Sequence, residues 1–90
     1  MKLKYQFVFQ PVGKTYMGVA VGGSAKQFSG MLQLNEVGHD IVSLMTDEIS
    51  RDEIVDKMLD IYDADRDTVC KYVDEVVEYL AENGVLCSLA

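Results

Sequence analysis

The stretch Gly30-Met-Leu-Gln-Leu-Asn-Glu-Val-Gly-His-Asp-Ile-Val-Ser-Leu44 passes directly from a strand pattern to a helix pattern. Leu32 and Leu34 lie two residues apart, which is the period of a half-buried strand. Asn35 then supplies a side chain of the kind that caps helix N-termini, and apolar residues follow at helical spacing. The predicted fold is therefore centred on a short strand that leads through one capping residue into a helix.

Two further strand patterns precede this stretch. Aromatic residues alternate with other residues over 4–10, and a second alternation runs over 15–21, with glycine and proline between and after them. The short connections predict a three-stranded antiparallel meander whose third strand, residues 30–34, lies at an edge. In that third strand we expect the two leucines to face inward, and Met31 and Gln33 to face outward.

Helix patterns fill the rest of the chain. Ser50 followed by Glu53 forms a capping-box signature, Asp65 is expected to cap the last helix, and Gly84 stands where such a helix should end. Strands followed by short-linked helices predict a single α+β domain over residues 1–90, with a winged helix-turn-helix outline. The expected helices cover residues 36–46, 51–62 and 66–83.

The charge of the chain is unevenly distributed. Residues 1–35 carry four lysines and no acid, whereas residues 36–90 carry all fifteen acids against four basic residues, a balance of −11 within the net charge of −7. A polarised surface follows. No apolar run approaches the roughly 18 residues of a membrane span, and the N-terminus alternates instead of forming a signal-peptide core. We therefore expect a cytoplasmic protein that binds no membrane and whose two cysteines are reduced.

Sites for metals, cofactors and catalysis have no support in the sequence. Asp63, Asp65 and Asp67 are spaced like the start of a calcium loop, but the glycine and glutamate that the loop requires are missing. His39 is the only histidine, so no zinc-ligand cluster exists, and we expect it at the surface of the first helix. No nucleophile motif or phosphate loop is present. The sequence predicts a protein that is not an enzyme and has no cofactor.

The third predicted helix has an unusually wide apolar sector. On a helical wheel, valines and Leu80 form its centre, while Tyr72 and Tyr79 extend it on one side and Cys70 on the other. The sector spans roughly 180°, wider than the ~100° stripe that packing on one side needs. Either the helix is central and uses the whole sector in the core, or the tyrosine edge lines a groove beside the third strand. In the second case an extended peptide could add to the free strand edge.

DNA binding is the alternative that a helix-turn-helix suggests. The outer face of the third helix carries Lys71 with four acids, where phosphate contact would need positive charge. A small winged-helix DNA-binding regulator is therefore the second hypothesis, and a protein-interaction module without a peptide substrate is the third.

The chain resembles the pyrroloquinoline quinone biosynthesis protein D family, the stand-alone recognition elements for ribosomally made precursor peptides. The resemblance rests on the stretch quoted above, on Glu53-Ile-Val before Tyr62-Asp, on Val69 through Asp74-Glu-Val-Val, and on Gly84-Val-Leu. It implies a module without catalytic residues that binds a leader peptide between strand three and helix three and presents it to a modifying enzyme, often a radical S-adenosylmethionine enzyme. The implied peptide contacts are Met31, Leu32, Gln33, Leu34, Val69, Tyr72, Val73, Val76 and Tyr79.

The positive strand half adds an expectation about the leader. Acidic residues of the leader could meet Lys4, Lys14 or Lys26, which would make its capture faster and sensitive to salt. The sequence leaves open which precursor is bound, and whether the module dimerises through its exposed strands.

Overall fold

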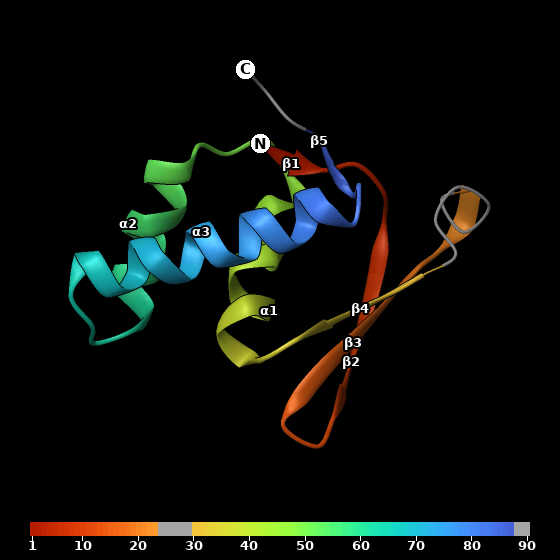
Figure 1. Ribbon diagram of the computed structural model, residues 1–90, viewed down its shortest axis with the longest axis horizontal. Coiled ribbons are helices and arrows are strands. Elements are labelled where there is room, and N and C mark those ends of the chain that lie inside the picture. The colour runs from red at the N-terminus through yellow and green to blue at the C-terminus, as the bar shows by residue number, and fades with distance from the viewer. Residues whose placement is uncertain (24–29, 88–90) are drawn as a thin grey trace.

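The computed structural model describes residues 1–23 and 30–87, and Figure 1 shows their arrangement. The strands β2 (Phe7–Val12), β3 (Thr15–Ala20) and β4 (Met31–Leu34) form one antiparallel sheet in the order β2-β3-β4. The predicted meander, with its third strand at an edge, is confirmed. The helices lie on one side of this sheet (Figure 1), and α1 (Glu36–Ser43) contacts both β3 and β4.

The first strand differs from the expected range 4–10. Residues 4–6 belong to no strand, and β2 begins only at Phe7. A separate short strand, β1 (Lys2–Leu3), lies before the expected range and pairs with β5 (Leu86–Cys87) near the other end of the chain. At its far end β2 continues through Pro11, which was expected to end the strand. Proline is tolerated there because β2 is an edge strand, where one side of the backbone has no neighbour in the sheet.

The three helices lie where the apolar spacing predicted them. The first is shorter than expected, because Leu44–Thr46 form a turn of 3₁₀ helix after α1. The second and third, α2 (Arg51–Ile61) and α3 (Arg66–Glu82), end within one residue of the expected positions. No helix in the described part of the chain combines the length and hydropathy that a membrane crossing requires.

Local capping determines where the helices begin. The Asn35 side chain accepts a hydrogen bond from the Gly38 amide at 2.8 Å, and the Asp65 side chain accepts one from the Thr68 amide at 2.8 Å. Ser50 and Glu53 form both bonds of a capping box. Each bond satisfies an amide that has no acceptor inside its own helix, so all three predicted caps are confirmed.

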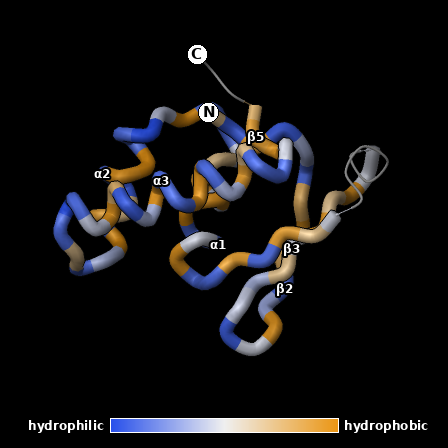
Figure 2. The backbone as a smooth tube through the Cα atoms, viewed as in Figure 1, coloured by the Kyte–Doolittle hydropathy of each residue, from blue (hydrophilic) through white to orange (hydrophobic). Residues whose placement is uncertain are grey.

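The core lies between the inner face of the sheet and the helices. Polar and apolar residues are interleaved along α2 and α3 (Figure 2), because only one side of each helix faces this core. Gly18 allows close packing on the sheet side: a Cβ atom there would lie 2.4 Å from Cε1 of Phe9 on the neighbouring strand. The fully or nearly buried core residues are Leu32, Leu34, Ile41, Val42, Met45, Ile49, Ile54, Val55, Met58, Val69, Val73, Leu80 and Val85.

Candidate functional site

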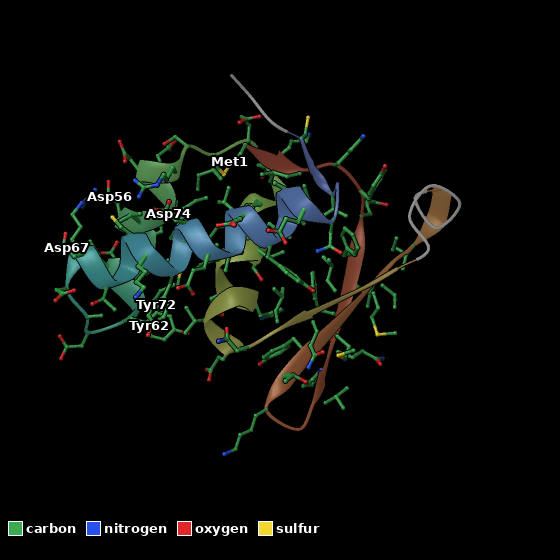
Figure 3. All side chains as sticks on the ribbon, viewed as in Figure 1. Met1, Asp56, Tyr62, Asp67, Tyr72 and Asp74 are labelled. Atoms are coloured by element: carbon green, nitrogen blue, oxygen red, sulfur yellow. The ribbon has the colours of Figure 1, made fainter. Side chains whose placement is uncertain are left out.

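One side of α3 presents an accessible apolar surface. Tyr72, Val76 and Tyr79 lie four and three residues apart, so they share a side of the helix. Tyr72 is 43% exposed, and the other two are half-buried. In Figure 3, Tyr72 projects from α3 on the side away from Asp74. We call Tyr72, Val76 and Tyr79 the α3 wall.

A hydrogen bond joins this wall to the edge of the sheet. The backbone amide of Gln33 donates to the hydroxyl of Tyr79 at 3.0 Å. Because β4 pairs with β3 on its other side only, this bond places the C-terminal half of α3 beside the free edge of β4. The α3 wall and the free strand edge therefore form one site.

The backbone of β4 supplies the polar groups of this edge. Backbone groups of an antiparallel strand point alternately to its two neighbours. Since the Gln33 amide points away from β3, the amide and carbonyl of Met31 lie on the same free side, while Leu32 and Leu34 bond to β3. The edge thus offers the backbone of two residues, Met31 and Gln33, for pairing with another chain.

The side chains of the nine predicted contact residues lie in three different places. Leu32, Leu34, Val69 and Val73 are between 0% and 6% exposed and belong to the core, so their side chains are not available to a ligand. Met31 and Gln33 are exposed but face the outer side of the sheet, as predicted. The accessible side chains beside the edge are those of Tyr72, Val76 and Tyr79.

Acidic residues border the α3 wall. Glu75 and Glu82 follow Tyr72 and Tyr79 at a spacing of three residues, and both are exposed. Neither forms an ion pair with any residue in the described ranges. The helix side of the site is therefore negatively charged.

Comparison with known proteins agrees with this geometry. Residues 11–86 match the family model of Coenzyme PQQ synthesis protein D, called PqqD. The chain belongs to the PqqD family.

A solved structure adds support for the fold. The chain is similar to TbiB1, whose structure is described as "TbiB1 in Complex with the TbiA(beta) Leader Peptide", with a TM-score of 0.73 and 24% sequence identity. The match covers 100% of this chain and 99% of TbiB1. A comparison with curated proteins finds no match.

An aromatic cluster in this PqqD-family chain was not foreseen. His39 was expected at the surface of α1, but its ring stacks on Tyr16 with centroids 4.0 Å apart and lies edge-on to Phe9 at 5.4 Å. The neighbouring residue, Asp40, accepts a hydrogen bond from the hydroxyl of Tyr62, which raises the pKa of Tyr62 to about 12. These contacts attach α1 to the sheet and to α2.

Two other acidic residues of the PqqD-family chain have structural partners. On the side of α3 opposite Tyr72, Asp74 accepts two hydrogen bonds from Arg51 at 2.6 and 3.0 Å, which lower the pKa of Asp74. Asp65, considered above as part of a calcium motif, caps α3. Within residues 1–23 and 30–87, no three His, Cys, Asp or Glu side chains are grouped closely enough to hold a metal ion.

Proposed function

We propose that this PqqD-family protein binds the leader segment of a ribosomally made precursor peptide and presents it to a modifying enzyme. The observation that carries the proposal is the free edge of β4 beside the α3 wall, where the Gln33 amide points away from β3 and toward Tyr79. The similarity to TbiB1, which was solved with a leader peptide, supports the same assignment.

Strand addition is the binding mechanism that this geometry supports. An extended leader pairs with the backbone of Met31 and Gln33, and this main-chain bonding supplies affinity without demanding a particular sequence. Alternate side chains of the added strand point toward α3, where Tyr72 and Val76 offer apolar contacts. The α3 wall therefore selects among leaders, while the strand edge holds them.

The chain acts as an adaptor in this proposal and does no chemistry itself. Its partner is a modifying enzyme, which the family resemblance suggests is a radical S-adenosylmethionine enzyme, and both work in the cytoplasm. DNA binding gains no support, because the exposed acids of α3 would face the phosphates.

A leader titration with a variant of the α3 wall tests the proposal. The probe is a fluorescein-labelled synthetic peptide with the N-terminal sequence of a short precursor encoded beside this gene, and binding is followed by fluorescence polarisation. Tyr72→Ala should weaken binding at least about tenfold, because it removes an aromatic contact from a site whose backbone bonds are shared by all peptides. Val12→Ala, at a residue that is 57% exposed near the β2–β3 turn, is the control and should bind as the wild type does.

Peptides with methylated backbone nitrogens test the mechanism. In an added strand only every second amide points to β4, so methylation of one alternate set should abolish binding and methylation of the other set should not. Equal effects of the two sets would exclude strand addition. No binding of the unmodified leader, or equal losses in the two alanine variants, would overturn the assignment.

A further inference from the structure

On the outer face of the sheet, the side away from the helices, the three strands carry no charged side chain, and five of the eight outward side chains are apolar. The register places Val8 opposite Val19 and Val19 opposite Met31, so the three side chains form a row across all three strands. The next row consists of Gln10, Met17 and Gln33. The two remaining outward positions, near the β2–β3 turn, are also uncharged. A face without any charge is unusual in a chain with 26% charged residues.

The side chains of the first row are well exposed. Val8 is 48%, Val19 41% and Met31 53% exposed. Of the six large apolar side chains that are exposed in the described ranges, four lie on this face, while Tyr72 belongs to the α3 wall. An exposed apolar row of this kind is suited to contact with another protein, because the centres of interaction surfaces are depleted in charge and enriched in methionine.

We propose that a second copy of this chain packs on the outer face, with Val19 at the two-fold axis. The row Val8–Val19–Met31 has Val19 at its centre, so a two-fold axis that passes over Val19 along β3 places Val8 of one copy near the partner's Met31. When two sheets pack face to face, their strand directions differ by about 30°. This arrangement allows the row of one copy to lie across the same row of the other copy. This interaction goes beyond the proposed function and does not depend on it.

The distribution of charge favours a second copy over a charged partner. All fifteen acids lie in residues 36–90, behind the sheet on the helical side, and no charged side chain of the three strands points outward. Two copies can therefore meet without removing a charge from water. The two copies, each with a net charge of −7, still repel each other, and salt screens this repulsion, so association should strengthen as salt concentration rises.

The size of the face predicts a weak and reversible dimer. Three strands ~4.8 Å apart, with ~3.3 Å per residue, give a face of roughly 15 by 20 Å, well below the ~800 Å² per partner of a stable complex. The free edge of β4 and the α3 wall stay uncovered, so a dimer of this kind can carry one leader on each copy.

Sedimentation equilibrium over a wide range of protein concentration tests this inference. The wild type should approach the mass of a dimer at high concentration, and Val19→Glu should stay monomeric, because it places two carboxylates at the symmetry axis. Ile61→Glu is the matched control: it adds the same charge at a residue that is 59% exposed on α2, and it should associate as the wild type does. Val19→Thr, which keeps a β-branched side chain, should weaken association several-fold if the glutamate variant does not fold.

Three results would overturn the inference. The wild type could remain monomeric at every concentration, or the two glutamate variants could lower association equally. Dissociation of the dimer by the leader peptide would show that the β4 edges pair with each other, not the outer faces. Leader binding is measured separately with labelled peptide, so failure of the dimer leaves the proposed function standing.

Discussion

The hydroxyl of Tyr79 occupies the place that a peptide carbonyl would take at the edge of β4. In the free protein this hydroxyl accepts a hydrogen bond from the Gln33 amide, and an added strand needs that same amide for its own pairing. An isolated edge amide is thereby kept bonded until a peptide arrives. Strand addition at this position must exchange one acceptor for another.

Removing this hydroxyl should favour leader binding. In Tyr79→Phe the ring remains part of the α3 wall, but the peptide no longer has to break a bond worth about 1 kcal/mol, so affinity should rise about fivefold. Tyr72→Phe is the matched control, because the hydroxyl of Tyr72 makes no hydrogen bond to the described residues, so its removal should give no gain in affinity. Weaker binding by Tyr79→Phe in the polarisation titration would show that the hydroxyl contacts the bound leader.

Side-chain contacts from the two ends of α2 join this helix to α1 and to α3. Tyr62 follows the last residue of α2, and its hydroxyl donates to Asp40 in α1. Arg51, the first residue of α2, binds Asp74 in α3. The first contact is half-buried and the second is exposed, so we expect the first to contribute more to stability.

The Tyr62 contact predicts a loss of stability at high pH. Hydrogen bonding to Asp40 and burial raise the pKa of Tyr62 from 10.0 to about 12 in the folded state. The contribution is therefore complete below pH 10 and disappears as pH rises toward 12, because the unfolded chain loses this proton first. Urea unfolding over this pH range should show that the free energy of unfolding of the wild type falls. Tyr62→Phe should be about 1.5 kcal/mol less stable than the wild type at neutral pH, and its free energy of unfolding should fall less as pH rises.

Tyr72→Phe is the control for loss of a phenol at an exposed position. It should keep both the stability of the wild type and its decline at high pH. If the stability of Tyr62→Phe fell as steeply with pH as that of the wild type, the contact between Tyr62 and Asp40 would be excluded as the cause of the loss.

The whole molecule has a basic strand side and an acidic helical side. Lys4 and Lys14 belong to the strand side, and Lys26, also expected to attract the leader, lies outside the described residues. Because Glu75 and Glu82 border the α3 wall, acids of a bound leader must face the strands and not the helix. That the leader is acidic stays a prediction, and the structure adds that its acidic side chains should point toward the strands.

Salt dependence of leader binding tests this polarity. A leader with acidic residues should bind more tightly at low salt, and Lys14→Gln should reduce that dependence, because surface charges act through screened, long-range attraction. Lys57→Gln, on the acidic side in α2, is the control. Equal affinities at low and high salt would exclude electrostatic attraction between the leader and the lysines, but they would leave strand addition as the binding mechanism.

Local signals in the sequence were sufficient to predict the three helices and the three strands of the main sheet. Asn35, Ser50 and Asp65 begin helices because each cap binds an amide only three residues further along the chain. The inward leucines of β4 follow from the period of a strand. The short strand β1 was missed because it pairs with β5, more than eighty residues away. No local period carries information about such a partner.

The sequence alone determined the order of the elements, their caps, the edge position of β4 and the wide apolar sector of α3. The tertiary structure alone decided how that sector is divided, with Val69 and Val73 in the core and Tyr72 exposed beside the strand edge. It also decided that Tyr79 binds Gln33 and that Val8, Val19 and Met31 align across the sheet. Helical and strand periods define which side a residue is on, whereas packing between distant segments defines what covers that side.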